Sequence, residues 1–241
     1  MNQQSTSAGD IYEDMSREGL DSGDAAGLVR FLLLAGRLKR LLRTGWLHSG
    51  VPPAEVESVA DHSFRTALLA WLAASREPGL NRDRVLAMAM VHDVAEALAG
   101  DPTPYDPDDL LTLDPEARRA FLDQRQVRSD GRQAAKRAAE RAAMGTILAT
   151  LAERDAGPVR ALWEEAEVGT TAEARFVKGA DRLERFLQAR EYGAADPALP
   201  LGSFTADLEA IDLPPSLAAI RDAIRGFDDR DIRADSGASS D

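Results

Sequence analysis

Hydrophobic residues recur at helical spacing along most of the chain, and this pattern predicts an all-α fold. In the segment 28–42, apolar residues follow the three-four spacing of a core-facing stripe, and basic residues collect at its end, where the helix dipole favours cations. The apolar positions of this stripe are Leu28, Phe31, Leu32, Ala35, Leu38, Leu41 and Leu42. We expect Thr44-Gly45 to stop the helix, and no run of residues shows convincing strand alternation.

The next helix is marked by a capping signal at its start. Ser58 is followed three residues later by Asp61, a pattern that resembles a capping box with an acidic distal residue. The helix is expected to end by Glu77-Pro78-Gly79, because this sequence stops helices. His62 therefore falls within its first or second turn.

A third helix contains the mostly apolar segment 85–99. Asn81 or Asp83 can cap its start with a side-chain oxygen. Gly100 and the following Asp101-Pro102-Thr103-Pro104 prevent its continuation, so Asp101 begins a stiff loop at a helix end.

The remainder of the chain is predicted to form further helices. They cover residues 115–125, 132–154, 158–167, 172–192 and 214–227. Thr170 and Glu173 are expected to cap the helix of 172–192. We interpret the acidic loop 106–114 as an insertion between helices and not as a second domain, because its flanks remain apolar and helical.

Length and composition indicate one compact helical domain. The 241 residues are 44% hydrophobic, and no uncharged apolar run reaches the roughly 18 residues that a membrane span requires. The domain is expected to cover 25–228, with disordered segments at 1–24 and 229–241, which are rich in Ser, Gly and Asp. Segment 1–24 lacks the basic start and apolar centre of a signal peptide, which favours a cytoplasmic location.

The net charge of the chain limits the kinds of molecule that the protein is expected to bind. A net charge of -12 argues against nucleic acid polymers and anionic membranes, which demand clustered Lys and Arg, but a local basic pocket for small anions is compatible with it. The basic residues of 118–141 alternate with Ala and Glu and lack interleaved aromatic residues, so we interpret this run as a solvated helix face. The absence of cysteine leaves His, Asp and Glu as the candidate metal ligands.

An imidazole and a carboxylate stand side by side in the apolar third helix, at His92 and Asp93. Glu96 lies one turn beyond His92, and Asp93 is rotated by about 100° from it. Burying these groups without partners would cost several kcal/mol, and a divalent cation between helices would compensate them. Taken alone, the pair favours a plainer interpretation, in which His92 donates to a backbone carbonyl and Asp93 pairs with an arginine.

Two other polar residues also have simple structural explanations when each is considered alone. His62 is typical of a capping or core-edge residue, and Asp181 can pair with Lys178 or Arg185 at helical spacing. Considered together with His92-Asp93, they form an ordered set of His, His-Asp and Asp over three predicted helices.

This ordered set resembles the HD-domain superfamily of metal-dependent phosphohydrolases. Further phrases look like its 5′-deoxynucleotidase branch, which includes the HD domain-containing protein 2 group. The matching phrases are 31–39, 43–46, 57–63, 91–96, 100–101 and 176–181. The resemblance covers 28–192, and several phrases in this order rarely arise together by chance.

The resemblance implies one divalent metal ion held by His62, His92, Asp93 and Asp181. Mixed imidazole and carboxylate ligands suit Mn²⁺, Fe²⁺, Co²⁺, Ni²⁺ or Zn²⁺ better than Mg²⁺, which prefers oxygen ligands. The resemblance also implies a homodimer, whose physical signature would be an apolar helix face left over after packing.

Two acidic residues have roles that follow from the resemblance and from their positions. Glu96 is expected to handle a proton as general acid or base, and the alternative is a carboxylate that orients His92. Asp101 matches the family's loop aspartate, which implies that it orients the sugar hydroxyl or the nucleophile. The alternative for Asp101 is an ordinary turn residue at a helix end.

The resemblance also assigns residues to the sugar and the phosphate. Trp46 matches a tryptophan that lines the sugar and disfavours a 2′-hydroxyl, and the alternative is a packed core aromatic. Bacterial enzymes of this class can carry the phosphate-binding arginine directly before the tryptophan. Here Gly45 precedes it, so Arg43 is the candidate.

Four other polar side chains lie in or near the matching phrases. Ser63 is expected to contact the substrate. Lys178 and Arg65 are further candidate cations for the phosphate, although surface pairing is the simpler interpretation of both. His48 is not expected to be a metal ligand.

The resemblance implies hydrolysis of deoxyribonucleoside 5′-monophosphates to deoxyribonucleoside and phosphate by metal-activated water. One alternative is another HD hydrolase that acts on a triphosphate, a guanosine alarmone or a cyclic nucleotide. A second alternative is a non-catalytic helical module with a structural metal. The presence of Glu96 and Asp101 favours the first interpretation.

Overall fold

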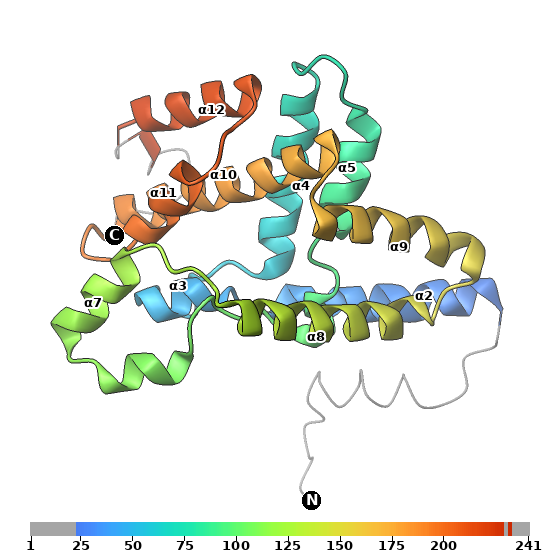
Figure 1. Ribbon diagram of the computed structural model, residues 1–241, viewed down its shortest axis with the longest axis horizontal. Helices are drawn as coiled ribbons and strands as arrows, with labels where there is room; N and C mark the ends of the chain where they lie inside the picture. Colours follow the sequence, from blue (N-terminus) through green and yellow to red (C-terminus); the bar gives the residue numbers. More distant parts are fainter. Residues whose placement is uncertain (1–22, 229–230, 233–241) are drawn as a thin grey trace, which may run out of the picture.

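The computed structural model describes residues 23–228 and 231–232, and all regular secondary structure within them is helical (Figure 1). The elements are α2 (Asp24–Ala35), η1 (Gly36–Arg40), α3 (Thr44–Ser49), α4 (Val59–Ala74), α5 (Arg82–Val91), α6 (Glu96–Ala99), η2 (Pro107–Thr112), α7 (Pro115–Asp123), α8 (Asp130–Leu148), α9 (Glu153–Val168), α10 (Ala172–Ala195), α11 (Gly202–Glu209) and α12 (Pro215–Gly226). The predicted all-α fold is confirmed. No helix among the described residues is both long and apolar enough to span a bilayer.

The expectation of disorder at the two ends of the chain falls almost wholly outside the described residues. At the first end, α2 already begins at Asp24, one residue before the predicted start of the domain. At the second end, the described pair 231–232 includes Ile232, whose side chain is buried.

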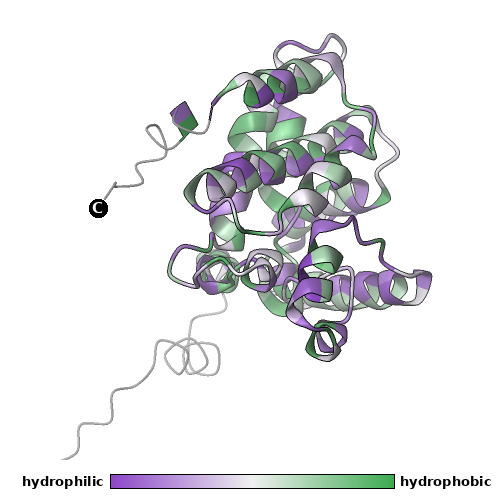
Figure 2. Ribbon diagram, turned by 90° about the vertical axis from the view of Figure 1, so that its left-hand side faces the viewer, coloured by the Kyte–Doolittle hydropathy of each residue, from purple (hydrophilic) through white to green (hydrophobic). Residues whose placement is uncertain are grey.

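Three helices form the centre of the molecule: α4 and α5 pack side by side, and α10 crosses both (Figure 1). Their apolar residues build the main core, which includes Val85, Phe176 and Leu183. Hydrophilic and hydrophobic residues alternate along the helices, as expected for helices that bury one face (Figure 2). A second core lies where α8 runs alongside α2 and contacts α6, and it includes Met144 and Trp163.

The capping signals at the starts of α4 and α5 are confirmed. The Ser58 hydroxyl accepts the Asp61 backbone N–H at 3.2 Å, and Asp61 in turn accepts the Ser58 backbone N–H at 2.9 Å. Asn81 caps α5 by accepting the Arg84 backbone N–H at 3.0 Å. The box at Ser58 fixes His62 in the first turn of α4, close to the centre of the fold.

The prediction of a continuous helix over 28–42 is wrong. The chain leaves the helical path after η1 and runs extended past Leu41, where the Val59 backbone N–H donates to the Leu41 carbonyl at 2.8 Å. Thr44 then begins α3 instead of stopping a helix. The reason is that the apolar stripe serves two cores: Leu41 packs in the second core, whereas Leu42 packs against Trp46 and its neighbours.

The helix predicted over 85–99 is interrupted at His92 and Asp93, two of the predicted metal ligands. Helix α5 ends at Val91, and α6 begins at Glu96. Between them the hydrogen bonds tighten to three-residue spacing, with the Glu96 N–H donating to the Asp93 carbonyl at 3.0 Å. Residues three apart eclipse in such a turn, so Asp93 and Glu96 lie on one side of it.

The helix predicted over 132–154 is too long, because α8 ends at Leu148 and Glu153 already belongs to α9. The Thr150 hydroxyl donates to a carbonyl of the last turn of α8 at 2.8 Å. The backbone of this turn also contacts Gly27 of α2. A Cβ atom on Gly27 would lie 2.3 Å from the Thr150 carbonyl oxygen, so only glycine fits at this position. Helix α2 therefore packs directly onto this turn. Pro158 consequently lies inside α9 and not at its start.

The cap predicted for α10 is displaced by one residue. Thr171, and not Thr170, accepts the Ala174 backbone N–H at 3.2 Å. Glu173 instead accepts the Asn81 backbone N–H at 3.1 Å and thereby ties α10 to the start of α5.

Besides α3, two short elements were not predicted, namely η2 and α11. The acidic loop 106–114 forms η2, which Asp106 caps by accepting the Asp108 backbone N–H at 3.1 Å. Helix α11 carries Phe204 and Leu208 at a spacing of four residues. Two apolar residues are too few to establish a helical period in the sequence.

Candidate metal centre

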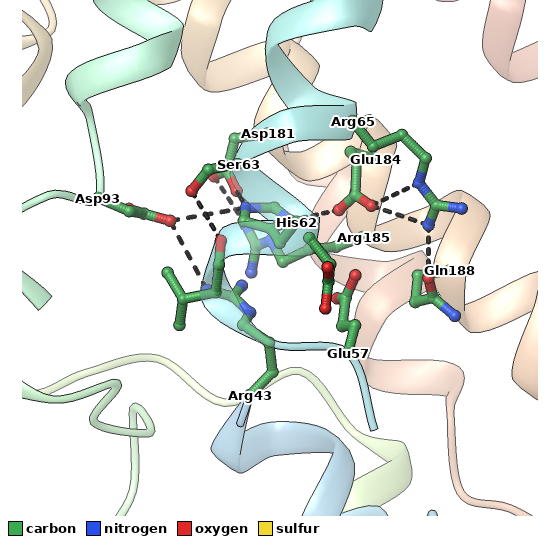
Figure 3. Close-up of polar contacts among 12 residues, drawn as sticks. Arg43, Glu57, His62, Ser63, Arg65, Asp93, Asp181, Glu184, Arg185 and Gln188 are labelled. Carbon is green, nitrogen blue, oxygen red and sulfur yellow. Dashed lines mark hydrogen bonds and ion pairs between the residues drawn. The ribbon is translucent and has the colours of Figure 1, made fainter. Parts of the chain in front are cut away.

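A fully buried imidazole lies at the centre of the site, on the first turn of α4. Nδ1 of His62 hydrogen-bonds the carboxylate of Glu184 from α10. Nε2 points the other way, 3.1 Å from Oδ1 of Asp181 and 3.7 Å from Oδ2 of Asp93 (Figure 3). This buried nitrogen makes no hydrogen bond.

The second imidazole comes from the turn between α5 and α6. Nδ1 of His92 bonds the Ala89 carbonyl at 2.7 Å, and this contact turns Nε2 toward Asp93, at 3.1 Å from Oδ2. The ring centroids of His62 and His92 are 5.8 Å apart. Nε2 of His92 is also buried without a hydrogen bond.

Asp181 completes the cluster from the middle of α10. Its Oδ2 accepts a hydrogen bond from Arg185, one turn further along the helix, at 3.2 Å. Burial alone would raise the pKa of Asp181, but the Arg185 cation and the nearby imidazole of His62 outweigh burial and hold the pKa well below its usual value. The carboxylate is therefore ionised and available as a ligand.

These groups fit a divalent cation. His62, His92 and Asp181 each offer one ligand atom, and the three atoms lie within 4.8 Å of one another. Oδ2 of Asp93 lies against the same two Nε2 atoms. Two buried imidazole nitrogens without hydrogen bonds, facing two carboxylates, are the donor set that borderline divalent metals prefer.

One buried guanidinium faces the acidic side of the cluster. Arg43 immediately precedes α3, and its Nη1 lies 3.7 Å from Asp93, 3.9 Å from Glu96 and 3.6 Å from Asp101. Asp101 also accepts the Thr44 backbone N–H at 2.8 Å, which ties the start of α3 to the loop after α6. The extended backbone before Thr44, which the sequence did not predict, thus delivers Arg43 to the site.

Glu96 is a buried carboxylate with an unpaired oxygen. Its side chain is 5% exposed, and Oε2 makes no hydrogen bond. Burial, together with the charges of Asp93 and Asp101, raises the pKa of Glu96 well above its usual value, although Arg43 opposes this. This environment favours the protonated form of the Glu96 carboxyl group, which is the form that a general acid uses.

The centre opens into a cavity of about 510 Å³. Six of the predicted site residues line it from the polar end, namely Arg43, His92, Asp93, Glu96, Asp101 and Asp181. His62 is fully buried behind them.

Trp46 lies at the border of this cavity and is nearly fully buried, at 1% exposure. Its Nε1 donates to Glu57 at 2.8 Å, and its ring stacks on Phe204 of α11 with centroids 3.8 Å apart. Tyr192 meets the ring edge-on at 5.2 Å. Trp46 is thus a packed aromatic that also borders the cavity.

The remaining candidates divide into those at the cavity and those away from it. Lys178 borders the cavity. Ser63 does not: its hydroxyl donates to the Val59 carbonyl within α4 at 2.7 Å. Arg65 points away from the cavity and pairs with acids of α10. His48 bonds the Tyr105 hydroxyl at 3.0 Å and is not among the three residues His62, His92 and Asp181.

The interpretation of 118–141 as one solvated helix face is wrong. The run is divided between α7, a connecting segment and α8, and its basic residues reach the cavity wall. Arg182 and Arg185 of α10 join them. The residues of the run that line the cavity are Arg125, Arg128, Lys136 and Arg137. The cavity is thus lined by eight Lys and Arg side chains and by six Asp and Glu side chains, a small basic excess within a strongly acidic chain.

Sequence reasoning missed Glu184, which acts on the cluster from α10, and named Arg185 only as an ordinary ion-pair partner of Asp181. Glu184 lies within one turn of Asp181, so the helical spacing alone could have indicated it as a companion of that residue. Phe204 was missed together with α11.

Comparisons with known proteins decide the family. Residues 35–205 match the family model described as HD domain. The chain belongs to the HD domain family. Its relatives include mouse "5'-deoxynucleotidase HDDC2", 39% identical over 171 residues that cover 71% of this chain and 72% of the relative. Fission yeast (Schizosaccharomyces pombe) "5'-deoxynucleotidase hdd1" is 30% identical over 176 residues, covering 72% and 76%.

Solved structures from other organisms share the fold. A conserved hypothetical protein from Pyrococcus furiosus superposes with a TM-score of 0.58 at 29% identity, covering 83% of this chain and 99% of its own. A predicted metal-dependent phosphohydrolase from Magnetospirillum magnetotacticum superposes with a TM-score of 0.58 at 25% identity, covering 84% and 91%. The helices that carry the cluster therefore belong to the HD domain scaffold itself.

The pH dependence of stability tests the electrostatics of this centre. Burial and the Arg43 cation lower the pKa of His62, but the adjacent carboxylates of Asp181 and Glu184 outweigh both and raise it to about 9. Because this value exceeds the unfolded value of about 6.5, the stabilisation is fully present below about pH 6.5 and is lost as the pH rises through about 9.

We therefore expect the unfolding free energy of chelator-treated protein to fall by about 3 kcal/mol between pH 6.5 and 9, measured by urea denaturation. The His62→Gln variant should lose most of this slope, whereas the His48→Gln variant should keep it. Wild-type stability that is flat or rises over this interval would contradict the assigned environment of His62.

Proposed function

We propose that this HD domain hydrolyses deoxyribonucleoside 5′-monophosphates to deoxyribonucleosides and phosphate, with one divalent metal ion held by His62, His92, Asp93 and Asp181. The observation that carries the proposal is the pair of buried, unbonded Nε2 atoms that face carboxylates at the polar end of a cavity. The names of the HDDC2 and hdd1 relatives supply the substrate class.

The charge of the cavity supports an anionic substrate. The whole chain carries a net charge of -12, yet eight Lys and Arg side chains border this one cavity. They are Arg43, Arg125, Arg128, Lys136, Arg137, Lys178, Arg182 and Arg185. A cleft lined by cations concentrates small anions. The acidic remainder of the chain repels nucleic acid polymers, so a free nucleotide suits the site better than a polymer.

The reaction adds water to phosphorus and breaks the bond between phosphorus and the 5′ oxygen of the sugar. When bound, the metal ion supplies a Lewis acid that lowers the pKa of water and neutralises phosphoryl charge. Arg43, whose Nη1 lies within 4 Å of three carboxylates, is placed to bind a phosphoryl oxygen. Glu96, whose pKa is raised, donates its proton to the departing 5′ oxygen, and the proton lost by the attacking water restores the acid form of Glu96.

Two further residues orient the substrate in this proposal. Asp101 is fixed by the Thr44 N–H, and its other oxygen faces Arg43, so it can hold the guanidinium and a sugar hydroxyl in place. Trp46, fixed by Glu57 and Phe204, forms a rigid wall beside the sugar that disfavours a 2′-hydroxyl. The unpaired Glu96 oxygen at the cavity wall favours this catalytic role over a purely structural metal.

The metal and the location complete the proposal. Two imidazole ligands favour Mn²⁺, Fe²⁺, Co²⁺, Ni²⁺ or Zn²⁺ over Mg²⁺. A cytoplasmic location would place the enzyme with the free nucleotide pool.

Phosphate release from a panel of nucleotides tests the activity. Chelator-treated protein receives Mn²⁺, Co²⁺, Zn²⁺ or Mg²⁺ separately, and deoxyribonucleoside 5′-monophosphates are compared with their ribonucleoside counterparts. We expect turnover that requires metal, is weakest with Mg²⁺ and prefers deoxyribose. Demonstrable metal binding without phosphate release from any monophosphate would refute the proposed activity.

Single substitutions separate metal binding from proton transfer. His92→Ala and Asp181→Ala should abolish bound metal and activity together, because each removes a ligand atom of the cluster. Glu96→Gln should keep the metal and lose roughly 10²–10⁴-fold in rate, the usual contribution of a general acid. Metal content by elemental analysis and phosphate release measure the two effects, and Glu209→Gln on the exposed face of α11 is the control. A metal-free His92→Ala variant that retains turnover would refute the mechanism.

The proposal includes a homodimer formed through α4. Phe64, Leu68 and Leu72 recur every four residues along this helix and are 64%, 41% and 50% exposed. Such a stripe is the expected signature of an apolar face that a second copy covers. Light scattering should show a dimer for the wild type and a monomer for the double variant Leu68→Gln/Leu72→Gln. A wild-type monomer at micromolar concentration would refute the dimer.

A further inference from the structure

Behind the metal cluster, a buried carboxylate connects His62 to an arginine on the same helix. Glu184 of α10 is fully buried, at 0% exposure. One of its oxygens bonds Nδ1 of His62, and the other accepts Nε of Arg65 at 2.8 Å (Figure 3). Both oxygens of this carboxylate are therefore engaged, one by His62 and the other by Arg65.

Arg65 is itself held rigidly by α10. Its Nη1 donates to both oxygens of Glu191 at 2.8 Å, and its Nη2 donates to Oε1 of Gln188 at 2.6 Å. The three acceptors Glu184, Gln188 and Glu191 follow one another at about one helical turn. They form a row along α10, and all three accept hydrogen bonds from Arg65 of α4. This arrangement fixes the position of Glu184 against the start of α4.

The two histidines of the cluster are supported differently. Nδ1 of His92 faces the neutral carbonyl of Ala89, whereas Nδ1 of His62 faces a carboxylate. A carboxylate accepts the proton of Nδ1 more strongly than a carbonyl does, and it makes the opposite nitrogen a better donor to a metal. The pairing therefore leaves the Nε2 lone pair of His62 directed toward Asp93 and Asp181.

We propose that Glu184, held by Arg65, is a positioning residue that fixes His62 with its proton on Nδ1 and its Nε2 lone pair aimed at the metal. This inference rests on the metal site of the proposed function, but not on the identity of the substrate. Glu184 does not line the cavity, and His62 is the only proposed metal ligand that it contacts. It therefore acts on the metal site through His62. Removal of such a supporting carboxylate usually costs 10–100-fold in metal affinity.

The test measures metal affinity without nucleotide. Mn²⁺ is titrated calorimetrically into chelator-treated wild type, Glu184→Leu and, as the matched control, Glu209→Leu, which removes an exposed acid from α11. We expect Glu184→Leu to weaken Mn²⁺ binding 10–100-fold and Glu209→Leu to change it less than twofold. Equal affinity of Glu184→Leu and wild type would overturn the inference.

A spectroscopic measurement on the wild type keeps the inference testable if Glu184→Leu fails to fold. The chain has only three histidines, so ¹⁵N-histidine labelling of the diamagnetic Zn²⁺-loaded protein gives a spectrum that can be assigned. His62 should show a strongly hydrogen-bonded proton on Nδ1 and none on Nε2. A proton on Nε2, or Zn²⁺ bound through Nδ1, would overturn the inference.

These readouts separate the two proposals. A wild type that binds Mn²⁺ but releases no phosphate refutes the nucleotidase activity, and the affinity of Glu184→Leu still decides the role of Glu184. A wild type that binds no divalent metal refutes the metal site and the positioning role together.

Discussion

The repulsion among four carboxylates is the constraint on which the rest of the structure depends. Asp93, Glu96, Asp101 and Asp181 converge from the segment 93–101 and from α10 onto one poorly solvated region. Two unit charges 4 Å apart repel by about 4 kcal/mol at an effective dielectric constant of 20, so compensation is required. Arg43 supplies one positive charge. Arg185 pairs with Asp181, and the raised pKa values of His62, His92 and Glu96 favour proton binding that also opposes the repulsion when no metal is bound. A divalent cation is the natural replacement for the protons on the imidazoles.

The fold brings these charges together through backbone contacts that fix each element at its end. The capping box at Ser58 sets the first turn of α4, and the Asp101 contact to Thr44 sets the start of α3. The tight turn after Val91 places Asp93 and Glu96 on one side of the chain. The two apolar cores pack against these helices, so the positions of the helix ends are fixed by packing as well as by hydrogen bonds.

The sequence predicted the cluster better than it predicted the path of the chain. The capping box, the order of His62, His92 and Asp181 and the all-α class are local or compositional signals, and the structure bears out the box and the class. The change to three-residue hydrogen bonds near His92 left no trace in composition, because alanine and valine suit either spacing. The extended segment before Thr44 depends on pairing with residues 57–59, a contact that no local pattern reports. The basic cavity wall likewise depends on how α7 and α8 meet α10.

Anomalous diffraction from crystals grown with Mn²⁺ tests the central claim most directly. The predicted result is one strong anomalous peak bound by Nε2 of His62, Nε2 of His92 and carboxylate oxygens of Asp93 and Asp181. Loss of that peak in Asp181→Ala crystals would agree with the same claim. A Mn²⁺ peak elsewhere on the protein, with both Nε2 atoms left unligated, would contradict it.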